Sequence, residues 1–166
     1  HQHEDHVGGV HALRSAFGHL PLHVPAPHVE LLKTFDAVPP YRARTWGVPT
    51  PIPDAIGFPP GEIFELGERV VVEGVATPGH TVGHVAFVAD TDRGVFALTG
   101  DLYLAAQPVS EWWESAADDR IRSCRALARH GDRLTFLPTH GKVRPDGAAR
   151  LEALAVYFEE TSRAVR

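Results

Sequence analysis

Apolar residues recur at helical spacing in four stretches of the chain. Val7, Val10, Leu13 and Phe17 lie three or four positions apart, and Gly18 ends the pattern. This spacing places the side chains on one face of a helix. The same reasoning predicts further helices at residues 27–36, 110–129 and 148–164. We expect the first and the third of these four helices to cover a sheet from outside.

Short apolar runs between turn residues predict strands. In the clearest run, Val70 and Val72 alternate with neighbours on the other face. Strands are predicted at residues 22–24, 70–76, 85–89, 95–98 and 134–137. Prolines and glycines crowd residues 37–61, which predicts a long loop inserted into the domain. This loop is either a surface excursion packed by its own aromatic residues or a wall of the substrate pocket, formed by Trp46 and Phe58.

Length and composition are typical of one globular domain. The chain has 166 residues, 43% of them apolar and 22% charged. No apolar run approaches the roughly 20 residues of a transmembrane helix, so we expect a cytoplasmic protein without a membrane partner. The net charge is −5, and the sequence contains no stripe of basic residues. Both features argue against nucleic acid as a partner. Cys124, the single cysteine, excludes an internal disulfide and is expected to be a small buried residue.

The first six residues carry an unusual density of metal-ligand side chains. They read His1-Gln2-His3-Glu4-Asp5-His6, and their imidazoles and the Asp5 carboxylate are enough for two ions. An alternating chain can aim two imidazoles at one ion, and a turn can aim the next two groups at a second. A purification tag would repeat one residue and would not continue into an apolar helical pattern. Imidazole nitrogen with carboxylate oxygen suits zinc, iron or manganese.

Three further ligand-type residues follow predicted strands. His80 lies on a Pro-Gly turn, Asp101 follows Thr99-Gly100, and His140 follows Pro138-Thr139. In each case an apolar run stops at a turn and a ligand-type side chain comes next. Strand ends meet at one edge of a sheet, so we expect these side chains to converge there.

Together these motifs resemble those of the metallo-β-lactamase fold superfamily of metallohydrolases, over almost the whole chain. The resemblance implies an α/β fold, the αββα sandwich in which helices cover two packed sheets. Members of the family have strands before the first motif, whereas this chain begins with it. We therefore expect residues 1–166 to be a single domain of this type that lacks its first strands and is incomplete at the N-terminus.

The resemblance also implies a binuclear metal site, with two zinc ions favoured and iron or manganese as alternatives. Carried over by motif position, the ligands are His1, His3 and His80 for the first metal, Asp5, His6 and His140 for the second, and Asp101 bridging both. A hydroxide between the metals would attack the substrate, and Asp5 could shuttle a proton. His84 is expected to support the ligand loop by a hydrogen bond.

The expected activity is hydrolysis of a small ester, thioester or lactone. Residues 77–84 are similar to the motif of glyoxalase II-type thioesterases, but the segment after Asp101 departs from it. Tyr103 in that segment is either a catalytic donor to an oxyanion or a core residue. Two other activities remain as alternatives: a non-haem iron oxidoreductase resembling persulfide dioxygenases, and a nuclease or phosphodiesterase. We also leave a homo-oligomeric state open. A scaffold without activity is disfavoured because no ligand is lost. Common β-lactamases have a cysteine where Asp101 stands, so drug hydrolysis is not expected.

Overall fold

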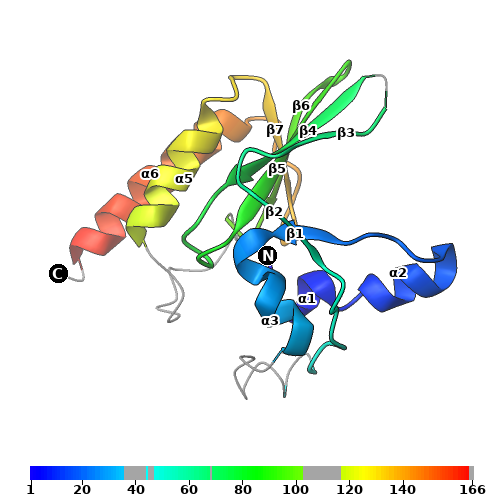
Figure 1. The fold of residues 1–166 in the computed structure, drawn as a ribbon. Helices are drawn as coiled ribbons and strands as arrows, with labels where there is room; N and C mark the ends of the chain where they lie inside the picture. The colour runs from blue at the N-terminus through cyan, green and yellow to red at the C-terminus, as the bar shows by residue number, and fades with distance from the viewer. Residues whose placement is uncertain (36–43, 45–46, 68, 103–116, 165–166) are drawn as a thin grey trace. The chain divides into compact units, whose positions relative to one another are not determined.

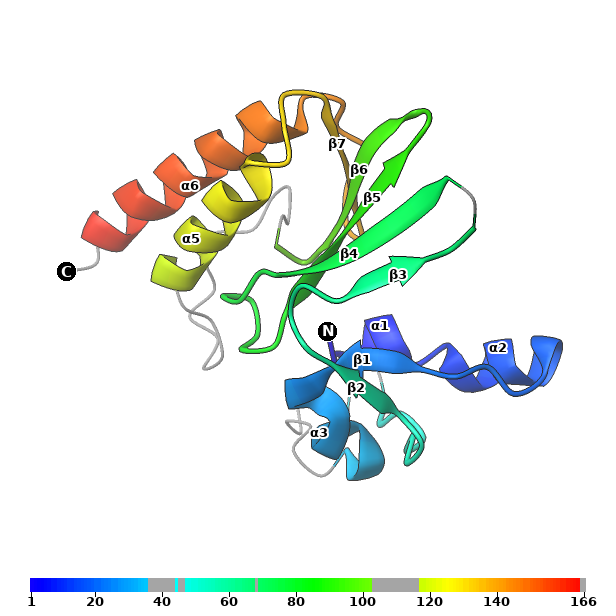
Figure 2. The ribbon, with the colours of Figure 1, turned by 45° about the horizontal axis from the view of Figure 1, so that its top comes forward.

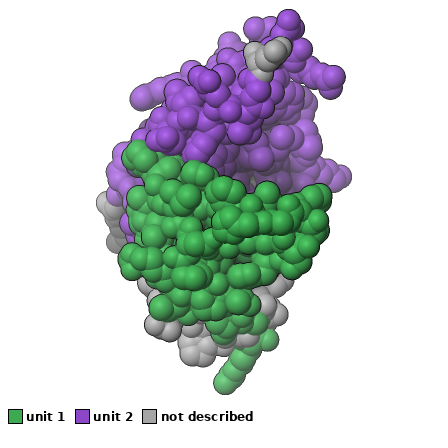
Figure 3. Space-filling view, turned by 45° about the vertical axis from the view of Figure 1, so that its right-hand side comes forward, with its two compact units in different colours: residues 1–59 green, residues 60–166 purple. Residues whose placement is uncertain are grey.

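The computed structural model describes residues 1–35, 44, 47–67, 69–102 and 117–164, shown from two sides in Figures 1 and 2. The chain divides into two compact units, unit 1 with residues 1–59 and unit 2 with residues 60–166 (Figure 3). Each unit has its own sheet. The expectations of a single domain and of missing first strands stay predictions.

Unit 1 is built from short elements around a small apolar core. They are α1 (Glu4–Val7), α2 (Val10–Phe17), β1 (His23–Pro25), the 3-10 helix η1 (Ala26–His28), α3 (Val29–Thr34) and β2 (Ile56–Phe58). β1 and β2 pair in parallel, with Val24 opposite Gly57. The core consists of Val7, Val24, Leu32 and Phe35.

Two expectations for unit 1 were wrong. The helix expected at residues 7–17 is interrupted at Gly8-Gly9, because glycine is a poor helix former. α2 has no buried residue, and Phe17 is 73% exposed, so the apolar face of this helix does not pack against the sheet of unit 1. In addition, β2 lies inside the segment expected to be a loop. Its pairing with β1 is a long-range interaction, which local composition does not reveal.

Unit 2 is a five-stranded sheet with two helices. Its strands are β3 (Ile63–Glu65), β4 (Val70–Ala76), β5 (Val85–Thr91), β6 (Gly94–Gly100) and β7 (Leu134–Pro138), and its helices are α5 (Ala117–Ala128) and α6 (Gly147–Ala164). The strand order is β3-β4-β5-β6-β7. Neighbours are antiparallel up to β6, and β7 runs parallel to β6. The carboxyl ends of β6 and β7 therefore lie at one edge of the sheet.

The core of unit 2 lies between the sheet and the two helices, which run side by side over one face (Figure 2). Ala86 and Val88 of β5 point into this core, and Phe136 of β7 is fully buried in it. From α5 the core takes Cys124 and Leu127, as the helical spacing predicts. None of the helices in the described ranges is long and apolar enough to cross a membrane.

We predict that the Cys124 thiol is inert in the folded protein. It is 0% exposed, and burial raises its pKa to about 12. Since the thiolate is the reactive form, iodoacetamide at pH 8 should label the native protein far more slowly than the same protein in urea. Mass spectrometry of timed samples measures both rates, and equal rates would contradict the buried position.

Candidate metal centre

The turn between β4 and β5 carries the first ligand-type residue of unit 2. His80 is 8% exposed and follows Pro78 and Gly79. The carbonyl oxygen of Pro78 accepts a hydrogen bond from Ser123 Oγ (2.7 Å), and that of Gly79 accepts one from Arg120 Nε (3.0 Å). Both donors belong to α5, so this helix holds the backbone that presents His80.

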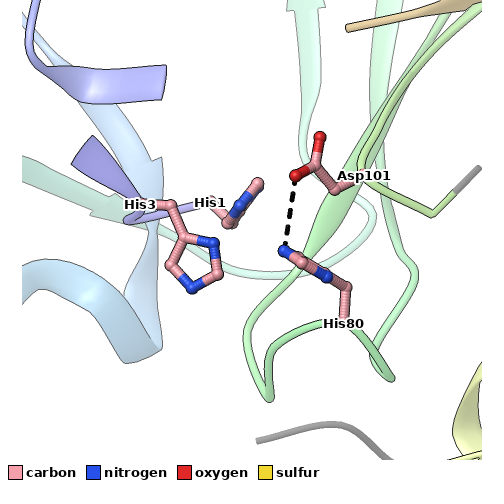
Figure 4. A group of neighbouring side chains, drawn as sticks. All are labelled: His1, His3, His80 and Asp101. Carbon is pink, nitrogen blue, oxygen red and sulfur yellow. Dashed lines mark ion pairs between the residues drawn. The ribbon is translucent and has the colours of Figure 1, made fainter. Parts of the chain in front are cut away.

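Asp101 follows the last residue of β6 and lies between two imidazoles. His80 Nε2 is 3.4 Å from Asp101 Oδ2 (Figure 4), and His140 Nε2 is 3.7 Å from Asp101 Oδ1. The carboxylate is buried, with Asp101 only 5% exposed. His140 comes from the segment after β7, the parallel neighbour of β6. Each carboxylate oxygen thus faces a different imidazole, and the three side chains converge at one edge of the sheet.

These distances fit metal ligands better than direct hydrogen bonds. Hydrogen bonds between nitrogen and oxygen usually measure about 2.7–3.2 Å. Two ligand atoms on one tetrahedral metal lie about 3.4 Å apart, because each bond to the metal is about 2.0–2.2 Å long. The donor types agree with this, since imidazole nitrogens and a carboxylate suit zinc or iron. The residues of unit 2 therefore fit a carboxylate that contacts a metal through each oxygen.

His84 supports Asp101 from within the core. Its Nε2 accepts a hydrogen bond from the Asp101 backbone amide (3.1 Å), and its Nδ1 lies 2.8 Å from Thr77 Oγ1. Because Nε2 accepts, the ring proton is on Nδ1, which donates to the threonine hydroxyl. Gly100 has a φ of +50°, and a Cβ there would lie 2.8 Å from His84 Nε2. A glycine at this position therefore lets the imidazole reach the amide next to it.

We predict that His84→Ala destabilises the metal-free protein by about 1–3 kcal/mol, because the buried Asp101 amide loses its acceptor. Urea unfolding measures the free energy of unfolding. His130→Ala, in the turn after α5, is the control and should stay within about 0.5 kcal/mol of the unsubstituted protein. Equal stability of both variants would contradict the role of the imidazole.

Unit 1 gathers its own ligand-type residues around the start of α1. His3 has extended backbone angles, and its carbonyl accepts the amides of His6 and Val7, so that the helix begins directly after it. The rings of His1 and His3 meet edge to face, with 4.4 Å between their centroids (Figure 4). The centroids of the His1 and His6 rings are 3.9 Å apart. His6 Nε2 is 3.7 Å from Asp5 Oδ2. The four groups of the first motif are therefore neighbours within unit 1.

The remaining expected site residues have different outcomes. Trp46 and Tyr103 lie outside the described residues. Phe58 ends β2 and is 3% exposed, so its place in a substrate pocket stays a prediction.

Sequence reasoning missed Arg120, which is 5% exposed. Arg120, Cys124 and Leu127 share the helical spacing of the buried face of α5, and a charged residue in such a stripe is the signal that could have revealed it. Burial lowers the pKa of the guanidinium, and the negative charge of Asp101 opposes that shift.

Comparison with known proteins gives both a family and relatives. The family profile described as the metallo-beta-lactamase superfamily matches residues 1–143. A hydroxyacylglutathione hydrolase from Bradyrhizobium sp. (strain BTAi1) is 32% identical over 127 residues, which are 76% of this chain and 42% of the relative. A lactamase-like protein from Aspergillus sp. (strain MF297-2) is 28% identical over 158 residues, 92% of this chain and 41% of the relative. The chain thus spans about two fifths of the length of these curated relatives.

Solved structures share the fold. A metallo-beta-lactamase family protein from Thermus thermophilus superposes with a TM-score of 0.72 at 20% identity, over 95% of this chain and 58% of that one. The protein TTHA1623, solved in a di-iron-bound form, superposes with a TM-score of 0.63 at 28% identity, over 93% of this chain and 74% of that one. These matches confirm the expected α/β fold class.

Proposed function

Because the chain belongs to the metallo-β-lactamase superfamily, we propose that it carries the catalytic centre of a metal-dependent hydrolase that cleaves a small-molecule thioester. The observation that carries this proposal is the position of Asp101. Its two oxygens face His80 Nε2 and His140 Nε2 at 3.4 and 3.7 Å, the spacing of atoms that share a metal. A buried carboxylate between two imidazoles is a typical core for a binuclear site.

The proposed ligand set is the one that the family motifs imply. Its members are His1, His3 and His80 for one metal, Asp5, His6 and His140 for the other, and Asp101 for both. Three observations support the set: the family membership, the grouping of donors around α1, and the grouping of donors around Asp101. We propose zinc, because nitrogen donors dominate the set. Iron is the alternative, and the di-iron-bound relative supports testing it.

When bound, the two ions would supply a hydroxide near neutral pH and polarise the carbonyl of the substrate. The chain's own residues have the tasks of holding and orienting. Asp101 presents one carboxylate oxygen to His80 and the other to His140. His84 accepts a hydrogen bond from the Asp101 backbone amide and so fixes the residue that carries this carboxylate. Asp5 is proposed to carry the proton to the leaving group, since a carboxylate suits such a transfer.

The thioester class follows from the relatives rather than from the fold. The hydroxyacylglutathione hydrolases from Bradyrhizobium sp. (strain BTAi1) and Pseudomonas putida (strain KT2440) are 32% and 34% identical over the matched regions. The segment after Asp101 departs from the glyoxalase II-type motif, so the thiol part of the substrate is proposed only as a class. Tyr103, in that segment, is proposed as a donor to the developing oxyanion.

The test uses the full-length protein with its metal content measured by mass spectrometry. We expect a hydroxyacylglutathione to be hydrolysed faster than an oxygen ester, a lactone or a phosphodiester. A chelator should remove the activity, and zinc should restore it. Turnover that persists after complete metal removal would overturn the metal-dependent mechanism. A metal-loaded protein that cleaves the phosphodiester but no thioester would overturn the substrate class.

A further inference from the structure

The two helices that cover the sheet of unit 2 differ in their exposed residues. In α5 the exposed residues are Asp118, Arg122 and Arg125, all of them charged. Among the described side chains of α6, the exposed ones include four apolar residues, Ala149, Ala153, Val156 and Tyr157. Val156 and Tyr157 are 40% and 41% exposed. Apolar residues that gather on an otherwise charged surface indicate a contact surface.

Four exposed residues of α6 lie along one line on the surface of the helix. They are Arg150, Ala153, Tyr157 and Glu160, and we call them the α6 stripe. Their spacing of three, four and three positions returns to the same side of a helix with 3.6 residues per turn. Leu151, Ala155 and Phe158 lie on another side of α6 and are buried in the core of unit 2. The stripe therefore has a cation at one end, an anion at the other, and a small and a large side chain between them.

The charges at the two ends of the α6 stripe are available for a further contact. Arg150 reaches Asp146 through Nε, at 2.9 Å, which leaves the outer nitrogens of the guanidinium. The neighbour of Glu160, Glu159, pairs with Arg125 at 2.8 Å, whereas Glu160 has no salt bridge with any described residue. Ten positions, about 15 Å along the helix axis, separate Arg150 from Glu160. These two side chains therefore cannot pair within one chain.

We propose that the α6 stripe is the contact surface of a two-fold symmetric dimer, and that its occupant is a second copy of this chain. When two α6 helices pack in antiparallel orientation, centred at the level of Ala155, Arg150 lies opposite Glu160 of the second copy. In the same arrangement Ala153 lies opposite Tyr157 of the second copy. Each contact occurs twice, because both subunits of a two-fold dimer use the same surface. The stripe is thus complementary to itself in charge and in size.

The order of charges and sizes along the stripe selects the antiparallel orientation. In a parallel pair each residue would lie beside its own copy, so that like charges would face each other at both ends, which is unfavourable. The two Tyr157 rings would also compete for one space, while the two Ala153 side chains would leave a gap. The antiparallel pair joins opposite charges and places a large ring over a small side chain. Ala149 and Val156, beside the stripe, add apolar area.

The proposed dimer is independent of the metal centre. One helix from each copy makes a small interface, so we expect weak, reversible association rather than a permanent dimer. The α6 stripe lies on the helix side of unit 2, whereas His80, Asp101 and His140 converge at the edge of the sheet. Dimerisation requires neither the metal nor the proposed activity. Each of the two proposals can therefore fail without the other.

Sedimentation velocity of the metal-free protein tests the association itself. Over a concentration series from about 5 to 500 μM, the average sedimentation coefficient should rise from the value of a monomer toward that of a dimer. The zinc-loaded protein should give the same curve. A coefficient that stays at the monomer value across the whole series would overturn the proposal.

Charge reversal tests whether the association uses the α6 stripe. Arg150→Glu and Glu160→Arg each create two like-charge contacts per dimer, so each should raise the dissociation constant about 10-fold or more. The double variant restores opposite charges with their positions exchanged, and it should regain most of the lost affinity. Both residues are exposed, and the new charges suit the dipole of α6, so the fold should be retained.

Arg93→Glu and Asp92→Arg are the matched controls, because both residues are exposed in the turn between β5 and β6. They change the net charge in the same way and should leave the dissociation constant within about twofold of that of the unsubstituted protein. Three results would each overturn the proposal: single reversals on α6 without effect, a double variant as weak as the single ones, or equal weakening in the controls.

Discussion

Asp101→Ala is expected to lower thioester hydrolysis by more than about 10³-fold, beyond the roughly 10²–10³ that removal of one oxyanion donor costs. The reason is that this single carboxylate faces both His80 and His140, so its removal takes one ligand from each side of the proposed site. The measurement is kcat/KM with the metal content of each preparation determined in parallel. Tyr103→Phe should cost less, because its phenol is one donor at most.

Asp90→Ala serves as the control for loss of a carboxylate. Asp90 lies on β5 and is exposed, so its removal should leave both activity and metal content unchanged. If Asp101→Ala retained its metal and the full activity of the unsubstituted protein, the proposed bridging role would be refuted.

Gly79→Ala is expected to destabilise the protein by about 3 kcal/mol or more, the largest stability effect that we predict. A non-glycine residue at a φ of +128° costs about 1–3 kcal/mol, and the overlap of its Cβ with the Arg120 backbone adds about 1–3 kcal/mol. Gly67→Ala is the comparison that isolates the cost of the overlap. Its φ is +125°, close to that of Gly79, but no described atom lies within 4 Å of a Cβ built there. Urea unfolding of both variants measures the difference, and equal losses would contradict the tight packing of α5 on the turn.

The sequence predicts those elements whose pattern is local. β4 was expected at residues 70–76 and has these bounds, and α6 begins one residue before its expected start. β2 and β3 are missed, because they are short and lie within or next to the proline- and glycine-rich residues 37–61, where local composition predicts a loop. The exposure of α2 shows the other limit. Helical spacing identifies an apolar face, but it does not show whether anything packs against that face.

The candidate site shows the same difference between features with a local sequence pattern and features that depend on long-range packing. Motif spacing was sufficient to group His80, Asp101 and His140, because all three follow strands of one sheet. The hydrogen bond from the Asp101 amide to His84 links residues 17 positions apart, and the contact of Arg120 with His80 spans 40 positions. Such pairs depend on how the helix and the sheet pack, and a single sequence carries no local pattern for them.

The strand order of unit 2 has a consequence for the order of folding. β4, β5 and β6 are joined in sequence as antiparallel neighbours, so the segment that brings His80 and His84 to Asp101 can assemble through local hairpins. β7 runs parallel to β6 and can pair only after the long crossover that contains α5 has closed. His140 should therefore reach Asp101 late. In stopped-flow refolding, a probe at the β5–β6 hairpin should report structure before a probe at His140. The contact between His80 and Asp101 should therefore form before the contact between His140 and Asp101, also when metal is present from the start.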